Sequence, residues 1–170
     1  MVVHVSLGSN LGDRQGFLRR AVEALDASPM VEVRKISSLY ETEPVGYKDQ
    51  PDFLNAAVEI ECAMPLGEFW ALTKAIERRI GRSRSERWGP REIDLDIIYF
   101  GDVVLDSAEL TVPHRERTKR RFVLEPITEL AGSFVDPVLG RTVQELLEAC
   151  DDPSRVARSA SALSPSLEKR

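Results

Sequence analysis

Two stretches of the chain alternate between hydrophobic and polar residues with the period of two that half-buried β-strands require. Near the N-terminus, Val3, Val5 and Leu7 share one face. Residues 53–62 alternate over a longer run. Its two faces are Leu54, Ala56, Val58, Ile60 and Cys62 on one side, and Phe53, Asn55, Ala57, Glu59 and Glu61 on the other. The pattern therefore predicts a strand in each stretch, with the hydrophobic face toward the core.

Four further stretches are also predicted to be strands. Residues 31–40 are rich in β-branched side chains, and residues 93–100 end in the apolar run Ile97-Ile-Tyr-Phe100. After a tight turn, residues 103–105 are expected to return beside residues 93–100. Residues 122–127 also predict a strand, but Pro126 lacks the N–H that a central strand needs, so this strand should lie at or near an edge.

Helical spacing alternates with these strands. Asp13 is a good N-cap for a helix, Pro65 suits the first turn of a second, and Thr142 and Glu145 form a capping box for a third. The apolar stripes of the first two are Phe17, Leu18, Ala21, Val22 and Leu25, then Leu66, Phe69, Trp70, Thr73, Ile76 and Ile80. Residues 41–52 contain two prolines and a glycine and predict a long loop. Together these elements predict an α+β sandwich with a largely antiparallel sheet covered by helices.

Composition and length favour a single domain. The chain has 170 residues, of which 42% are hydrophobic and 30% charged, as in an ordinary globular domain. We expect the domain to cover residues 1–150 and residues 151–170 to form a loosely packed or disordered C-terminal tail, because periodicity stops at Asp151. The net charge of −5 argues against a general nucleic-acid binder.

The sequence also indicates a compartment and a class of metal. It has no apolar run near the roughly 20 residues that a membrane span needs, and its start does not resemble a signal peptide. Cys62 and Cys150 stand outside any CxxC pattern, which favours buried thiols in a reducing, cytoplasmic setting. With His4 and His114 as its two histidines, the chain favours a hard cation held by oxygens over zinc.

Asp94 and Asp96 are the most informative pair of side chains. Two residues apart on a strand, they lie on one face about 7 Å from each other, and the same alternation puts Ile93, Leu95, Ile97 and Tyr99 on the other face, toward the core. Two like charges on a half-buried face repel unless a cation lies between them, and a pair of Mg²⁺ ions would suit. The alternative is that each aspartate pairs with an arginine on a solvated face.

Basic residues are concentrated in two short segments. The first holds Arg78, Arg79, Arg82, Arg84, Arg87 and Arg91, and the second Arg115, Arg117, Lys119, Arg120 and Arg121. Guanidinium groups can donate paired hydrogen bonds to phosphate oxygens, so these segments favour binding of a polyanionic ligand. A solvated helix end is the simpler explanation for Arg78 and Arg79. A nucleic-acid contact patch is the weaker alternative, because few aromatic residues are interleaved with the charges.

A few aromatic and polar residues could form a ligand site. Phe53 is out of phase with the apolar face of its strand, so with Asn55 it could form a platform for a flat heterocycle, with Phe122 as the opposite wall. On phase alone, an ordinary core position under a helix is the favoured explanation for Phe53. His114 could contact a phosphate or cap a turn, and residues 8–12 predict a strand-to-helix turn.

The motifs that contain these residues resemble those of a known family. In order, they are Gly8-Ser-Asn-Leu-Gly12, Pro44-Val-Gly46, Gln50-Pro-Asp-Phe-Leu-Asn-Ala56, Arg87-Trp-Gly-Pro-Arg91, Ile93-Asp-Leu-Asp-Ile97, Val112-Pro-His114 and Arg121-Phe-Val-Leu124. Over roughly residues 1–150 they look like the 6-hydroxymethyl-7,8-dihydropterin pyrophosphokinase family of folate biosynthesis. The resemblance implies a ferredoxin-like fold and transfer of pyrophosphate from ATP to the pterin hydroxymethyl group, with release of AMP.

The resemblance also implies roles for individual residues. Asp94 and Asp96 would bind two Mg²⁺ ions and, with Arg82 and Arg91, form the catalytic set. The pterin would contact Thr42, Val45, Phe53, Asn55, Trp88 and Phe122. ATP would contact Glu77, Arg82, Arg84, Trp88, Arg91, Ile97, Thr111, His114 and Arg120. The expected partners are these two small molecules, with neither nucleic acid nor membrane, and a monomer is compatible with the sequence.

Overall fold

The computed structural model of the chain describes residues 1–81 and 90–163. Its strands are β1 (Val2–Ser9), β2 (Val31–Ile36), β3 (Tyr40–Thr42), β4 (Phe53–Cys62), β5 (Asp94–Phe100), β6 (Leu105–Asp106), β7 (Thr111–Val112) and β8 (Val156–Arg158). Its helices are α1 (Arg14–Asp26), α2 (Leu66–Ile80), the 3-10 turn η1 (Arg117–Lys119), α3 (Arg121–Ala131) and α4 (Val143–Glu148).

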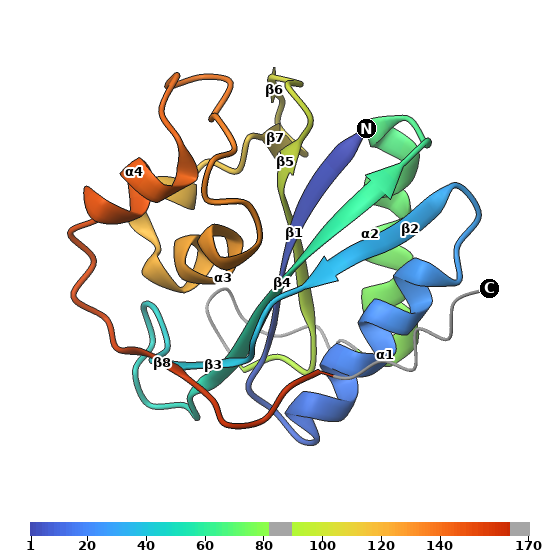
Figure 1. The fold of residues 1–170 in the computed structure, drawn as a ribbon. Helices are drawn as coiled ribbons and strands as arrows, with labels where there is room; N and C mark the ends of the chain where they lie inside the picture. Colours follow the sequence, from blue (N-terminus) through green and yellow to red (C-terminus); the bar gives the residue numbers. More distant parts are fainter. Residues whose placement is uncertain (82–89, 164–170) are drawn as a thin grey trace.

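The main sheet is antiparallel at each of its pairings. Its strands follow the order β5-β1-β4-β3-β8. Strand β2 pairs with the C-terminal half of β4, and β3 pairs with the N-terminal end of the same strand. Helices α1 and α2 cover one face, and α3 and α4 lie on the opposite side (Figure 1). The predicted α+β sandwich with a largely antiparallel sheet is therefore confirmed, as is the ferredoxin-like arrangement that the resemblance implied.

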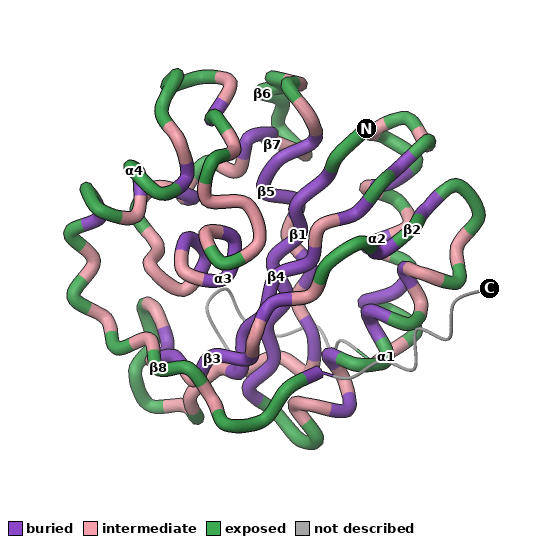
Figure 2. Tube along the Cα trace, in the orientation of Figure 1, coloured by how far each residue is buried: buried purple, intermediate pink, exposed green. Residues whose placement is uncertain are grey.

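A separate hydrophobic core fills each face of the sheet. The larger core contains the predicted apolar faces of β1 and β4 together with most of the predicted stripes, namely Leu18, Ala21, Val22 and Leu25 of α1 and Phe69 and Ile76 of α2. The smaller core joins the other face of the sheet to Val123, Leu124 and Ile127 of α3 and to Val143 and Leu146 of α4. Burial is accordingly concentrated along the central strands β1 and β4, between the two helical layers (Figure 2).

Helix starts follow the sequence closely. Asp13 caps α1 by accepting a hydrogen bond from the Gly16 N–H at 3.1 Å, and α2 begins directly after Pro65. At α4 the capping box is complete. The Thr142 hydroxyl accepts from the Glu145 N–H at 3.2 Å, and the Glu145 carboxylate accepts from the Thr142 N–H at 2.8 Å.

The prediction for residues 122–127 is wrong, because they belong to helix α3. Val123, Leu124 and Ile127 are buried at helical spacing against the sheet, and this packing outweighs the β-branched composition. Pro126 lies inside the helix. The consequence is that Phe122 approaches the sheet from the first turn of a helix.

Two other strand predictions need correction. The expected strand over residues 31–40 is divided into β2 and β3, and its register against β4 shifts between Val33 and Lys35. Residues 103–105 do not return beside β5. Instead, β6 pairs with β7 in a separate two-stranded ribbon.

A β-bulge changes which way the end of β5 faces. The register against β1 runs His4 to Tyr99 and Val5 to Ile97, so Ile98 is the extra residue. An extra residue reverses the alternation beyond it. Tyr99, expected on the face of Ile97, is therefore buried in the α3/α4 core instead.

The expected loose tail is packed through residue 163. Strand β8 pairs with β3, the Ser159 N–H donates to the Leu39 carbonyl at 2.7 Å, and Leu163 is buried in the larger core. The rest of the predicted tail, residues 164–170, lies outside the described residues. Among the described helices, none combines the length and apolar character that a membrane crossing requires.

Candidate active site

A cavity of about 250 Å³ opens on the α3/α4 face of the sheet, toward one end of its central strands. Its lining comes from β1, β3, β4, β5, the loop after β3 and the segment between β7 and α3. The lining residues are Ser6, Gly8, Thr42, Glu43, Val45, Phe53, Asn55, Arg91, Asp94, Asp96, His114, Arg120 and Phe122. Ten of these were named from the sequence as site residues, so the fold brings most of the predicted set together.

A second cavity, of about 320 Å³, adjoins the first. It lies between α2, β5 and the β6–β7 ribbon, and includes Trp70, Lys74, Ile97, Glu109, Thr111 and Arg115 among its lining residues. Asp96 and His114 line both cavities. The two spaces therefore meet at a carboxylate and an imidazole.

The two aspartates differ in their surroundings. Arg91 Nη1 lies 3.1 Å from Asp94 Oδ1. Asp94 therefore has the arginine partner that the alternative to metal binding predicted. For Asp96, burial together with the charges of Asp94 and Glu77 raises the pKa to about 7, despite the opposing charges of Lys74 and Arg120. An added cation would relieve this unfavourable charge.

His114 presents a neutral imidazole to the junction. Burial and the charge of Arg120 lower its pKa to about 4. Its Nδ1 accepts a hydrogen bond from the Glu116 N–H at 3.2 Å. Because Nδ1 acts as an acceptor, the ring proton is on Nε2, which makes that atom a hydrogen-bond donor at neutral pH.

The floor of the first cavity depends on a missing side chain. A Cβ on Gly8 would lie 2.6 Å from Asn55 Oδ1 and 3.5 Å from Phe53 Cδ1. Asn55 is buried and its Nδ2 donates to the hydroxyl of Thr42. Gly8 is thus more than a turn residue, because it lets the Asn55 amide approach the strand beside it.

An aromatic and a guanidinium form the opposite wall. The Arg120 guanidinium lies over the Phe122 ring, 5.7 Å from its centroid. Phe53 lines the same cavity from β4. The cavity is therefore bounded by an aromatic ring from the sheet and another from the start of α3.

Several predicted site residues lie apart from the first cavity. Ile97 and Thr111 line the second cavity only. Glu77 lines neither of the two cavities. It is buried on α2 behind β5, where its Oε1 accepts from the Leu95 N–H at 2.8 Å and its carboxylate pairs with Lys74 at 3.3 Å. Arg82, Arg84 and Trp88 lie outside the described residues.

Asn10 was missed as a site residue. It is buried, and its Nδ2 donates to Gln50 Oε1 at 2.9 Å and to the Pro51 carbonyl at 3.0 Å. Its Oδ1 accepts from the Arg91 N–H at 2.8 Å, and its own N–H donates to the Arg91 carbonyl at 3.0 Å. Asn10 therefore ties the 43–52 loop to the segment that delivers Arg91. The sequence placed it in a turn, and nothing local indicated these distant partners.

Lys74 was also missed. It lines the second cavity and is half-exposed on α2, one turn before Glu77. The sequence signal that could have found it is this spacing of three residues, which puts a lysine and a glutamate on the same side of a helix.

Comparison with known proteins agrees with this geometry. The model of the family described as 7,8-dihydro-6-hydroxymethylpterin-pyrophosphokinase (HPPK) matches residues 4–132. A Bacillus subtilis protein named 2-amino-4-hydroxy-6-hydroxymethyldihydropteridine pyrophosphokinase is 47% identical over 129 residues, which are 76% of this chain and 77% of that protein. A Synechocystis protein of the same name is 40% identical over 147 residues, which are 86% of this chain and 75% of that protein.

Solved structures show the same fold. The HPPK-DHPS protein of Plasmodium falciparum matches with a TM-score of 0.69 at 15% sequence identity. The match covers 87% of this chain but only 45% of that one. At this low identity the likeness concerns the fold alone.

Proposed function

The chain belongs to the 7,8-dihydro-6-hydroxymethylpterin-pyrophosphokinase family, and we propose that its two joined cavities hold the two substrates of the family's reaction. It is an enzyme of folate biosynthesis, which transfers pyrophosphate from ATP to the hydroxymethyl group of 6-hydroxymethyl-7,8-dihydropterin and releases AMP. The observation that carries the assignment of the cavities is their junction at Asp96 and His114.

The pterin fits the first cavity. Phe53 and Phe122 offer aromatic walls for its flat ring, which gains from stacking on such surfaces. Asn55 and Thr42 supply buried amide and hydroxyl groups for its polar edge. Val45 lines the same space from the loop after β3.

ATP then occupies the second cavity, with its phosphates at the junction. Ile97 and Thr111 line this cavity, and Lys74 brings a positive charge to it. Arg91, Arg120 and the Nε2 donor of His114 surround the junction from the other side. Charge neutralisation and positioning are what phosphoryl chemistry chiefly asks of a protein.

The donor set of Asp94 and Asp96 fits Mg²⁺. Two carboxylates on one strand face match the way Mg²⁺ is held, by one or two carboxylates together with substrate phosphates. Among the described residues there is no group of three or more ligating side chains that could hold a metal ion alone. We propose that this pair would hold two Mg²⁺ ions, which would neutralise negative charge on the phosphates of ATP.

The remaining residues of the proposed site support those that contact the substrates or complete the substrate-binding set. Asn10 joins the 43–52 loop, which lines the pterin cavity, to Arg91, which we place beside the phosphates, so one residue from each proposed substrate set depends on the same support. Arg82, Arg84 and Trp88 complete the proposed ATP-binding set from outside the described residues. We also propose a cytoplasmic location, which is consistent with two buried, free thiols at Cys62 and Cys150.

The decisive test is substrate-dependent AMP release. Purified protein with ATP, Mg²⁺ and 6-hydroxymethyl-7,8-dihydropterin should form AMP and the pterin diphosphate in equal amounts, and EDTA should stop the reaction. Calorimetry with the pterin and α,β-methylene ATP should show both ligands bound at once. If AMP does not form and RNA binds with a steep salt dependence instead, the nucleic-acid alternative would be correct.

A further inference from the structure

A buried ion pair lies behind the junction of the two cavities. In the turn η1, Arg117 Nε lies 2.5 Å from Asp136 Oδ2, and Arg117 Nη2 donates to Asp136 Oδ1 at 3.1 Å. Asp136 is fully buried and Arg117 is 8% exposed. Bidentate pairing of this kind fixes the orientation of both side chains.

The carboxylate of Asp136 is held from several sides. Its Oδ1 also accepts from the N–H groups of Val138 and Leu139, at 2.9 and 3.0 Å, and its Oδ2 accepts from the Tyr99 hydroxyl at 2.9 Å. Burial alone would raise the pKa of Asp136, but hydrogen bonds from Arg117 and these groups hold it below its ordinary value. Asp136 is therefore a rigid, ionised anchor attached to the sheet through Tyr99.

The same arginine contacts the backbone of His114, whose side chain lies at the cavity junction. Arg117 Nη1 donates to the His114 carbonyl at 3.0 Å, and the Arg117 N–H donates to that oxygen at 3.2 Å. The His114 N–H in turn donates to the Ile98 carbonyl of β5 at 2.9 Å. The backbone of His114 is thus held between the sheet and Arg117.

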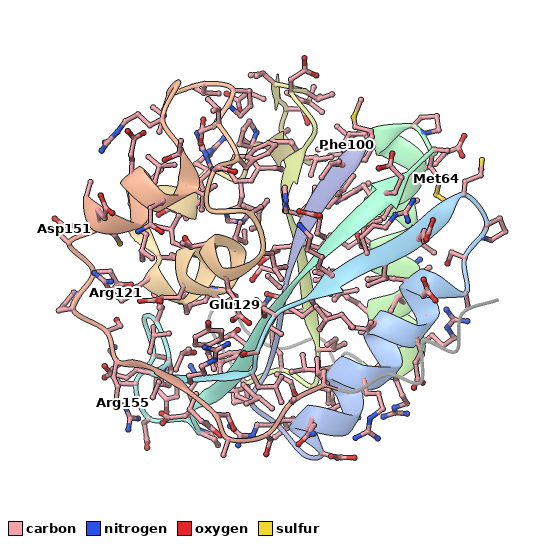
Figure 3. The ribbon with its side chains drawn as sticks, in the orientation of Figure 1. Met64, Phe100, Arg121, Glu129, Asp151 and Arg155 are labelled. Atoms are coloured by element: carbon pink, nitrogen blue, oxygen red, sulfur yellow. The ribbon has the colours of Figure 1, made fainter. Side chains whose placement is uncertain are left out.

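The far end of this segment is fixed separately. The Arg121 N–H donates to Asp152 Oδ2 at 3.0 Å, and the Arg121 guanidinium donates to the carbonyls of Cys150 and Asp152. Figure 3 shows Arg121 at the α3 layer, on the same side as Asp151. Between these two fixed ends, the backbone carries the side chains of His114 and Arg120 into the cavities.

We propose that Arg117 and Asp136 are positioning residues for the nucleotide phosphates, acting through the backbone of His114 and the turn that leads to Arg120. The inference rests on the proposed function, in which His114 and Arg120 contact ATP. Neither Arg117 nor Asp136 lines either cavity, so their effect must be indirect. Phosphate-contacting groups need such support, because a misplacement of about 1 Å caused by a distant mutation can cost about 100-fold in rate.

A double-mutant cycle separates positioning from stability. Arg117→Met leaves the Asp136 charge buried without its partner, and Asp136→Asn leaves the Arg117 charge in the same state. The double variant R117M/D136N removes both charges, while the new amide oxygen can still accept from Val138 and Leu139. We therefore expect the double variant to be more stable than the sum of the single effects predicts. It still lacks the side-chain donor to the His114 carbonyl.

The measurements are the Kd of α,β-methylene ATP with Mg²⁺, the Kd of the pterin and the midpoint of thermal unfolding. We expect both single variants and the double variant to bind the nucleotide at least tenfold more weakly, with pterin affinity changed less than threefold. Recovery of nucleotide affinity together with stability in R117M/D136N would overturn the proposal.

Val143→Ala provides the matched control. Val143 is fully buried at the start of α4, in the smaller core between the sheet and α3. Truncating this side chain should lower the free energy of unfolding without altering the His114 segment. Its nucleotide Kd should stay within threefold of the parent protein. An equal loss in this control would mean that loosening the α3/α4 layer is sufficient, which also overturns the proposal.

His114→Ala and Arg120→Ala distinguish the two levels of inference. If neither weakens nucleotide binding, the proposed function of this segment fails and the positioning role fails with it. If both weaken it while R117M, D136N and the double variant do not, the proposed function stands and the positioning role alone is refuted.

Discussion

Replacing Asp96 with asparagine should separate stability from activity. The side chain keeps its shape, but it loses the charge that the fold disfavours and the proposed metal requires. We expect Asp96→Asn to abolish Mg²⁺-dependent AMP formation. At the same time it should make the unliganded protein more resistant to unfolding at pH 8.

The size and sign of this effect follow from the pKa. Burial and the neighbouring carboxylates raise the pKa of Asp96 to about 7 from an ordinary 3.8. The native state then holds a proton between about pH 4 and pH 7 that the unfolded chain has already released, so stability falls as pH rises through this window. Above it the full penalty applies, at most about 4 kcal/mol at 1.36 kcal/mol per pKa unit. Asparagine carries no such penalty.

The assay is thermal unfolding in EDTA at pH 4.5 and at pH 8. If half of the maximum is realised, a gain of about 2 kcal/mol corresponds to a rise of roughly 4–8 °C in Tm for a chain of this size. The gain should appear at pH 8 and nearly vanish at pH 4.5. An equal change at both values would refute the reasoning, and so would a loss at pH 8.

The matched control is the same substitution at a carboxylate with the opposite pKa shift. The pKa of Asp136 is held below its ordinary value, so its charge stabilises the fold above the unfolded pKa and the benefit disappears as pH falls through the folded value. Asp136→Asn should therefore lower the free energy of unfolding at pH 8, by about 3–5 kcal/mol as for other broken buried pairs.

Three further substitutions test other parts of the structure. Phe122→Ala should weaken pterin binding at least about fivefold in calorimetry, because an aromatic stacking partner contributes about 1–3 kcal/mol, whereas nucleotide binding should change less than threefold. Equal losses would assign Phe122 to the core. Asn10→Ala should raise the KM of both substrates together, since the Asn10 side chain supports both the 43–52 loop and Arg91. A change confined to the KM of the pterin would show that Asn10 does not support both sets of contacts. Thr142→Ala should lower the free energy of unfolding by about 1 kcal/mol through loss of the capping box, while kcat at 25 °C stays unchanged. An unchanged Tm would show that α4 does not need this cap.

Local patterns predicted the strands β1, β4 and β5 and the helices α1, α2 and α4, because each side-chain period there had one consistent explanation. The alternation over residues 53–62 matches β4 residue for residue, and Asp13 and Thr142 cap the helices that follow them. The failures arose where tertiary packing decided the outcome. Residues 122–127 are too few to distinguish a strand from a helix by period, and their burial against the sheet selected the helix.

The candidate site was predictable where chemistry is local and hidden where it depends on distant partners. The spacing of Asp94 and Asp96 placed both carboxylates on one strand face, and both line the first cavity. Asn10 gave no such signal, because its partners Gln50, Pro51 and Arg91 are 40 to 81 residues away. Tyr99 was assigned to the wrong face because a bulge cannot be inferred from a regular apolar run.

Two carboxylates of this chain, Asp136 and Asp96, have opposite surroundings, and the contrast indicates what each is for. Asp136 is surrounded by a guanidinium, a hydroxyl and two N–H groups, which lower its pKa and make its charge part of the fold. Asp96 lies beside other carboxylates at the junction of two cavities, where burial raises its pKa. A charge that is costly in the free protein becomes favourable once a cation binds. The ionised carboxylate of Asp96 therefore lowers the stability of the free protein, and cation binding offsets this cost. That is the expected property of a ligand site rather than of a structural ion pair.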